Sequence, residues 1–247
     1  MFSLRRSTFA YEPYPVCYAT DVFEGPVYDE LAQTYPDRKL FQHKPELGDK
    51  YSLSERNNAD QYHKFLASSP AWGRLHAYVK SKTFVDETLE FLKSHNIDLG
   101  LGNFTFVSKA RAKRASLLSR IRRMPELGAR FEFSAMGGNG GHILPHTDNH
   151  NKLITLVLSM NERETWDQAW GGGTEICMPR DRSKIFNHVN FYMGFDDVEL
   201  LGNYGFHPNQ SLLFIKTFNS WHQVSPIHTP SSAPLRKTLT INIERLV

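Results

Sequence analysis

Hydrophobic positions follow two different periods along the chain. Between residues 61 and 96 they recur at helical spacing, as in Tyr62, Phe65 and Leu66. This spacing predicts amphipathic helices whose aromatic side chains belong to the core. From Ala129 onward the pattern changes to short apolar or alternating runs, which are typical of strands. We expect strands at residues 130–136, 152–160, 174–178, 190–193, 211–218, 222–227 and 235–243.

Clusters of Gly, Pro and Asn separate these predicted strands, and many short strands with regular turns favour a sandwich or a barrel. The first part of the chain is expected to be mostly helical. Its predicted elements are a strand at 14–19, a short helix at 26–34, a loop at 37–60 and the helices at 61–96. The sequence therefore predicts an N-terminal helical support region (1–128) and a β-barrel-like catalytic core (129–247) that act as one unit.

Composition places the chain among ordinary globular enzymes. It has 247 residues, 40% of them hydrophobic, and a formal net charge of +3, which does not by itself indicate a nucleic-acid partner. Cys17 and Cys177 lack metal-type spacing, so free thiols in a reducing compartment are expected. No apolar run approaches the roughly 20 residues of a membrane helix, and no secretory pattern follows the first arginines. We predict a cytoplasmic protein with no membrane partner.

One segment, residues 108–123, is strongly basic. It contains Lys109, Arg111, Lys113, Arg114, Arg120, Arg122 and Arg123 and no acidic residue. Three interpretations are open: a solvated helix face, a rim that attracts an anionic substrate, and a nucleic-acid surface. The last is disfavoured because no aromatic residues for base stacking are interleaved with the charges.

A candidate metal site lies in the second half of the chain. His146 and Asp148 are two positions apart between a Gly-rich turn and a predicted strand, so in an extended segment both side chains point to one side. His222 opens a later strand. Two imidazoles and one carboxylate on one face of an iron ion leave positions open for a bidentate cosubstrate and O2. The alternative is a surface histidine beside an exposed aspartate. His142 is expected at the mouth of the site rather than as a ligand.

The last predicted strand has two distinct faces. Arg236, Thr238, Thr240 and Asn242 share one face, and Leu239, Ile241 and Ile243 share the other. An arginine fork matches a carboxylate, and a threonine hydroxyl can add a hydrogen bond. The polar face therefore suits a barrel lumen that binds a dicarboxylate, although an amphipathic edge strand would show the same pattern. Lys237 falls on the apolar face.

The second half of the chain resembles a known family. The stretch from Arg130 to Glu244 is similar to the prolyl-4-hydroxylase-like branch of the Fe(II)/2-oxoglutarate-dependent oxygenases. The motifs that carry the resemblance are 146–148 (HTD), 170–175 (WGGGTE), 209–218, 220–224 (SWHQV) and 236–238 (RKT), in the family's order.

The resemblance implies a mainly β fold with α support, whose core is a double-stranded β-helix, or jelly roll. It implies Fe(II) bound by His146, Asp148 and His222. It also implies that Arg236, with Thr238 beside it, binds the distal carboxylate of 2-oxoglutarate. Many relatives place a Tyr on the strand before the HTD motif. Here that strand has none, so Ser134 or Asn161 is expected to supply the second contact to the cosubstrate.

The implied activity is that of a dioxygenase using Fe(II), 2-oxoglutarate and O2. It would hydroxylate an unactivated C–H bond of a small metabolite, amino-acid-like or a natural-product intermediate, and release succinate and CO2. Asp148 favours hydroxylation or desaturation over halogenation, because halogenating relatives lack this carboxylate. The alternatives are a hydroxylase of a protein residue, a jelly-roll binding protein without turnover, and a nucleic-acid dealkylase.

Overall fold

The computed structural model describes residues 2–107 and 124–246. In these residues the strands form two sheets, and all pairings are antiparallel except that of β5 with β6. The major sheet has the order β1-β2-β11-β8-β13-β6-β4-β3 and the minor sheet β10-β9-β12-β7. The major strands are β1 (Ser7–Ala10), β2 (Val16–Thr20), β3 (Gln42–Lys44), β4 (Lys50–Ser54), β5 (Thr105–Phe106), β6 (Glu126–Met136), β8 (Lys152–Ser159), β11 (Gln210–Ile215) and β13 (Arg236–Arg245). The minor strands are β7 (Ile143–His146), β9 (Thr174–Pro179), β10 (Val198–Tyr204) and β12 (His222–Val224).

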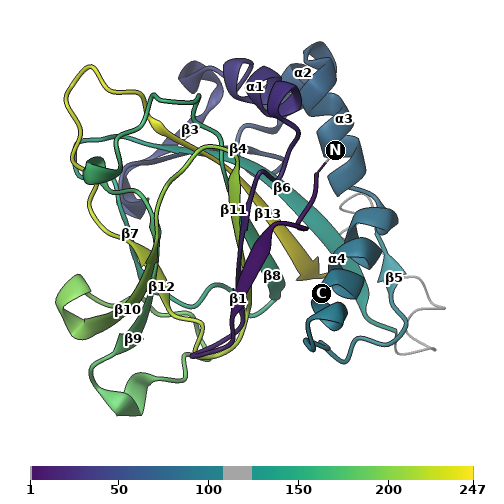
Figure 1. Cartoon of the computed structure of the whole chain (residues 1–247), viewed down its shortest axis with the longest axis vertical. Coiled ribbons are helices and arrows are strands. Elements are labelled where there is room, and N and C mark those ends of the chain that lie inside the picture. The colour runs from purple at the N-terminus through teal and green to yellow at the C-terminus, as the bar shows by residue number, and fades with distance from the viewer. Residues whose placement is uncertain (1, 108–123, 247) are drawn as a thin grey trace.

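Helices lie along one side of the major sheet and the minor sheet lies along the other (Figure 1). The α-helices are α1 (Gly25–Gln33), α2 (Ala59–Ser68), α3 (Pro70–Val79) and α4 (Lys82–Ser94). Short 3-10 helices are η1 (Arg38–Leu40), η2 (Pro45–Leu47), η3 (Gln168–Trp170), η4 (Arg182–Lys184) and η5 (Phe195–Asp197). No helix in the described part of the chain is long and apolar enough to span a membrane.

The two faces of the major sheet have opposite character. On the outer face, Leu156, Leu239 and Phe133 are buried in the main core together with side chains of the helices. The ring of Trp72 on α3 lies 4.8 Å from that of Phe133, centroid to centroid. Each large apolar side chain buried in this way contributes about 1.5–3 kcal/mol to stability. The inner face carries polar side chains on β6 and β13 and an apolar cluster that includes Val16, Leu212 and Phe214, and with the minor sheet it encloses a cavity.

The mainly β jelly-roll architecture expected from the sequence is confirmed, and so is the parity of the last strand. Leu239, Ile241 and Ile243 are buried in the core under the helices, whereas Arg236 and Thr238 line the cavity. The helical prediction for 61–96 corresponds to α2, α3 and α4. The predicted short helix at 26–34 corresponds to α1.

Two local predictions are wrong. Residues 37–60 are not a loop, because they contain η1, β3, η2 and β4, and β4 pairs with β6 in the major sheet. The N-terminal region therefore adds strands to the sheet as well as helices. Residues 190–193 are not a strand. The side chain of Asn187 binds the backbone N–H and C=O of Phe191, so local contacts replace a strand ladder there. The basic segment 108–123 lies outside the described residues.

A close contact fixes the β3–β4 hairpin against the strand that carries the candidate metal site. Gly48, between η2 and β4, has a φ of 73°, a conformation that side chains other than glycine adopt only at a cost. Its carbonyl accepts a hydrogen bond of 3.0 Å from the backbone N–H of His142. A Cβ atom at Gly48 would lie 1.9 Å from the carbonyl oxygen of His142. The hairpin reaches the site because residue 48 has no side chain.

Gly48→Ala is therefore expected to destabilise the protein by at least about 2 kcal/mol, since backbone strain and a backbone clash act together. Gly140→Ala is the matched control. Gly140 has a φ of 80° but open space around its Cβ position, so strain alone costs about 1 kcal/mol. Denaturant unfolding of the purified variants measures both losses, and equal losses would contradict the importance of the contact.

Candidate metal centre

Two short neighbouring strands of the minor sheet bring the two histidines together. β7 and β12 are paired so that His222 lies directly opposite His146. The two imidazole ring centroids are 4.3 Å apart. Asp148 follows β7 after one residue, with a φ of 71°. Residues 146 and 148 therefore reach the same point, as expected, but through a left-handed backbone at Asp148 and not through the extended segment that the sequence suggested.

The three side chains offer ligand atoms to one point. The Nε2 atom of His146 lies 3.5 Å from Oδ1 of Asp148, and the Nε2 atom of His222 lies 3.9 Å from Oδ2. One ligand atom from each of the three lies within 4.8 Å of the other two. Ligand atoms about 2.1 Å from one ion and at right angles to each other lie about 3 Å apart. The arrangement fits a divalent metal ion after a small contraction.

Hydrogen bonds orient both imidazoles. The Nδ1 atom of each ring lies 2.9 Å from a backbone carbonyl, that of Leu144 for His146 and that of Ser220 for His222. Each Nδ1 therefore carries the proton and donates it, which leaves the Nε2 lone pair free for a metal. Burial, helped by the neighbouring His146, lowers the pKa of His222 to about 3. His222 is thus neutral at physiological pH, as a metal ligand must be.

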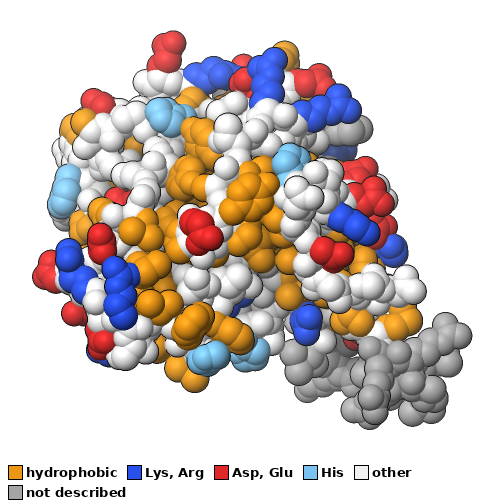
Figure 2. Space-filling view, turned by 60° about the horizontal axis from the view of Figure 1, so that its bottom comes forward, with side chains coloured by type: hydrophobic (Ala, Val, Ile, Leu, Met, Phe, Trp, Pro, Cys, Tyr) orange, Lys and Arg blue, Asp and Glu red, His pale blue; other side chains and the backbone are white. Residues whose placement is uncertain are grey.

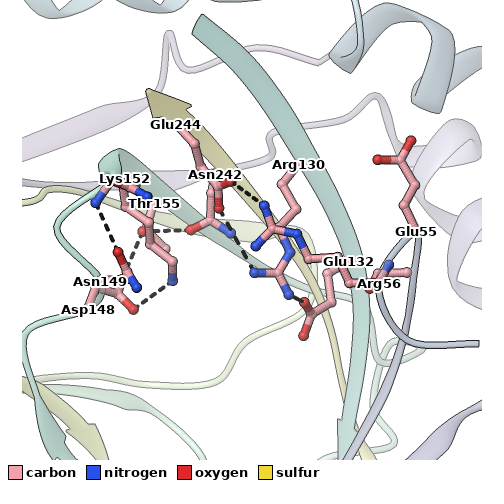
Figure 3. Close-up of polar contacts among 12 residues, drawn as sticks. Glu55, Arg56, Arg130, Glu132, Asp148, Asn149, Lys152, Thr155, Asn242 and Glu244 are labelled. Atoms are coloured by element: carbon pink, nitrogen blue, oxygen red, sulfur yellow. Dashed lines mark hydrogen bonds and ion pairs between the residues drawn. The ribbon is translucent and has the colours of Figure 1, made fainter. Parts of the chain in front are cut away.

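The carboxylate of Asp148 is anchored at both oxygens (Figure 3). Lys152 Nζ lies 2.6 Å from Oδ1, and the hydroxyl of Thr155 lies 3.0 Å from Oδ2. The Thr155 hydroxyl is also 2.9 Å from the side-chain oxygen of Asn242 on β13. Burial alone would raise the pKa of Asp148, but the neighbouring Lys152 ammonium outweighs it and holds that pKa well below its usual range.

The cavity between the sheets has a volume of about 380 Å³, and its lining includes the three candidate ligands. Arg236 also lines it and is 4% exposed. Its Nε donates to the carbonyl of Gly172, and its guanidinium lies 4.7 Å from the centre of the Phe206 ring. Among the described residues no carboxylate pairs with it. Burial lowers the pKa of Arg236 to about 9. A buried cation without an acidic partner is costly, so the cavity is suited to an anion.

The remaining predicted residues divide into two groups. Thr238 and Ser134 both line the cavity and lie opposite each other on β13 and β6. Asn161 does not line it. Its amide nitrogen donates to the carbonyl of Leu235 and its oxygen accepts from the N–H of Lys237. Of the two residues suggested for the second contact to the cosubstrate, Ser134 lines the cavity, whereas both ends of the Asn161 amide bind backbone.

Several residues of the site were not anticipated. Lys152 and Thr155 hold the carboxylate, and Tyr192 stacks on His146 with ring centroids 5.2 Å apart. Leu47, from the segment expected to be a loop, lines the cavity. Thr155 could have been found by extending the alternation of its strand. His142 lines the cavity and stays outside the ligand group, as expected.

The chain is similar to known proteins in part of its sequence and in its fold. Residues 131–244 match the family model described as the 2OG-Fe(II) oxygenase superfamily. No curated protein sequence matches the chain. The structures below are all less than 20% identical to the chain, so they show similarity of fold alone.

A prolyl hydroxylase from Trichoplax adhaerens, solved in complex with a hypoxia inducible factor peptide fragment, is 13% identical with a TM-score of 0.50, over 93% of this chain and 83% of that one. A prolyl 4-hydroxylase from Phytophthora capsici is 16% identical with a TM-score of 0.55, over 93% of this chain and 58% of that one. The protein IDO from Bacillus thuringiensis is 12% identical with a TM-score of 0.50, over 93% and 92%.

Arg236→Met is expected to leave the melting temperature of the ligand-free protein unchanged or higher, because it removes a buried charge without a counter-ion. The same variant should lose the stabilisation that 2-oxoglutarate gives to the wild type, which reaches about 2.7 kcal/mol when the ligand is at 100 times its Kd. Thermal unfolding with Mn(II), with and without 2-oxoglutarate, measures both effects.

Lys237→Met is the control for that experiment. Lys237 is the next residue on β13, but its Nζ lies on the outer face, 5.7 Å from the centre of the Tyr35 ring. It should keep the full stabilisation by 2-oxoglutarate. An equal loss of stabilisation in both variants would contradict a specific role of Arg236.

Proposed function

Because residues 131–244 match the model of the 2OG-Fe(II) oxygenase superfamily, we propose that this chain is such an oxygenase and hydroxylates an unactivated C–H bond of a small metabolite. The family assigns Fe(II) as cofactor and 2-oxoglutarate and O2 as cosubstrates. Bound together, these supply the oxidising chemistry that converts a C–H bond to an alcohol and releases succinate and CO2. The protein's own residues hold, orient and shield the reacting groups.

In this proposal His146, Asp148 and His222 are the iron ligands. The neutral Nε2 atoms and the ionised carboxylate meet the requirement that metal ligands be deprotonated. Their places opposite each other on β7 and β12, and in the loop that follows β7, put all three on one side of an ion. The other side is left for the cosubstrates, as in sites with two histidines and one carboxylate generally.

One observation carries the proposal: Arg236, a buried cation without a carboxylate partner among the described residues, lines the same cavity as the three candidate ligands. A protein that only held a metal would gain nothing from such a charge. We assign Arg236 to the distal carboxylate of 2-oxoglutarate, with Thr238 beside it and Ser134 as the second contact. The hydroxyl of Ser134 donates to Glu132 at 3.2 Å and would turn to reach the cosubstrate.

The cavity volume supports a small substrate. At about 380 Å³ it falls near the lower end of the range of about 300–1,000 Å³ found for small-molecule sites, and the cosubstrate fills part of it. Leu47 and Tyr192 line the space on the exposed side, 43% and 51% accessible, and would cover a bound molecule from water. Tyr192 stacked on His146 also shields that ligand.

A protein residue is the second candidate substrate. The observation in its favour is exposed apolar surface in the segment that leads to Tyr192, where Phe186 and Val189 are 64% and 81% exposed. Hydrophobic side chains also gather in a band across the face drawn in Figure 2. Large exposed apolar patches often mark sites of interaction with other proteins. One structure of similar fold was solved with a bound peptide fragment.

The cofactor assignment is tested by titrating anaerobic metal-free protein with Fe(II) and 2-oxoglutarate. A visible metal-to-ligand charge-transfer band is expected in the wild type. It should be absent in His146→Ala, and in Arg236→Ala it should require at least tenfold more 2-oxoglutarate, because about 1.4 kcal/mol of binding energy or more is lost. Iron binding to the wild type without any band would favour the binding protein without turnover.

The substrate class is tested by succinate formation. Adding the low-molecular-mass fraction of a cell extract to the iron-loaded protein is expected to raise succinate formation several-fold above the substrate-free rate. The protein fraction of the same extract should have no effect, and His146→Ala serves as the blank. Stimulation by the protein fraction alone would overturn the small-molecule proposal in favour of the second candidate.

A further inference from the structure

An irregularity in strand pairing lies next to the candidate metal centre. β8 and β13 pair without interruption from Thr238 opposite Ser159 to Ile243 opposite Ile154. The next pair is Glu244 with Lys152, so Leu153 is an extra residue on β8. This is a β-bulge, which redirects the side chains that precede it on the strand.

The bulge decides which way Lys152 points. In a regular strand Lys152 would share the outer face with Ile154, two residues away. Instead Leu153 and Ile154, although adjacent, both pack with the core on the outer side of the sheet. Lys152 lies on the inner side with Thr155, and both line the cavity. The fold thus places a cation on a face where simple alternation would not put it.

The redirected ammonium group contacts the candidate ligand carboxylate. Lys152 Nζ lies 2.6 Å from Oδ1 of Asp148, and the two side chains are only 17% and 8% exposed. Another lysine nearby, Lys216, donates to the carbonyl of Thr217 instead. The second oxygen of Asp148 is held by the neutral hydroxyl of Thr155. One oxygen therefore has a charged partner and the other an uncharged one.

We propose that Lys152 is a positioning residue whose fixed charge, acting through Asp148, makes the site prefer ferrous over ferric iron and so raises the reduction potential of the bound metal. This inference rests on the proposed iron ligands. A positive charge a few ångströms from a metal ion repels a trivalent ion more than a divalent one. In a buried site the difference is only weakly screened. Partners behind the ligands are among the means by which proteins tune bound metals.

A purely structural role for Lys152 would have a different signature. If it only neutralised a buried carboxylate, its loss would lower stability but would leave the balance between the two oxidation states unchanged. The reduction potential separates the two roles, because it reports the ratio of the affinities for Fe(III) and Fe(II). A substitution that weakens the binding of Fe(III) and of Fe(II) equally leaves that ratio unchanged.

The test uses the full chain loaded with Fe(II), without 2-oxoglutarate, in a mediated redox titration followed by the electron paramagnetic resonance of Fe(III). In Lys152→Met the preference for Fe(II) should fall at least tenfold, or about 59 mV for a one-electron couple. Lys152→Arg keeps the charge and should stay within a third of that shift. Lys237→Met removes a lysine from the outer face and should not shift the potential.

Thr155→Val supplies a second comparison, because it removes the hydrogen bond to Asp148 without changing any charge. Its potential should stay close to that of the wild type. An unchanged potential in Lys152→Met, or an equal shift in Thr155→Val, would overturn the inference. If Lys152→Met does not fold, Lys152→Gln carries the same expectation. Failure of the proposed function looks different, since the wild type would then not bind iron or His146→Ala would bind it equally well.

Discussion

The alternation of side chains across the major sheet is the constraint on which the rest of the structure depends. The central strands β6, β8 and β13 each contribute one row of side chains to the helix-covered core and one row to the inner face that carries the cavity. Phe133 and Leu239 face the helices, whereas Ser134 and Thr238, their neighbours in the chain, face the cavity. The same strands therefore supply the hydrophobic core on one side and the candidate site on the other. A shift of one residue in strand register would disrupt both.

Charged groups on the inner face of the major sheet are buried and therefore need partners of opposite charge. Glu132 is buried, and burial alone would raise its pKa, but Lys50 and Arg130 bind it and hold that pKa far below its ordinary value. Glu244 is likewise bound by Arg56 and lies near Arg130 (Figure 3). Most of the inner-face charges are thus matched by an opposite charge. Arg236 differs, because within residues 2–107 and 124–246 its guanidinium meets a carbonyl and an aromatic face but no carboxylate. Such an exception in a set of paired charges is typical of a binding site.

The sequence predicted the site best where it depends on local geometry. His146 and Asp148 meet as predicted, although the left-handed backbone of Asp148, and not an extended segment, brings them together. The parity of the last strand placed Arg236 and Thr238 in the cavity. What could not be predicted depends on partners far away in the chain. The bulge that turns Lys152 inward exists only in the pairing of β8 with β13. The 37–60 segment is polar and forms β4 because β6 offers it an edge. Asn161 has the chemistry of a ligand-binding residue, but nearby backbone groups bind both ends of its amide.

The absence of a side chain at Gly48 limits the ways in which the substrate range of such a protein can change. The hairpin that carries Leu47 lies against the backbone of His142 with no space between them. It therefore acts as a fixed wall of the cavity rather than a movable lid. Exchanging this hairpin for one of another length would shift the backbone next to the metal ligands. Substrate specificity at this wall can instead change through single side-chain substitutions, which leave the main chain in place.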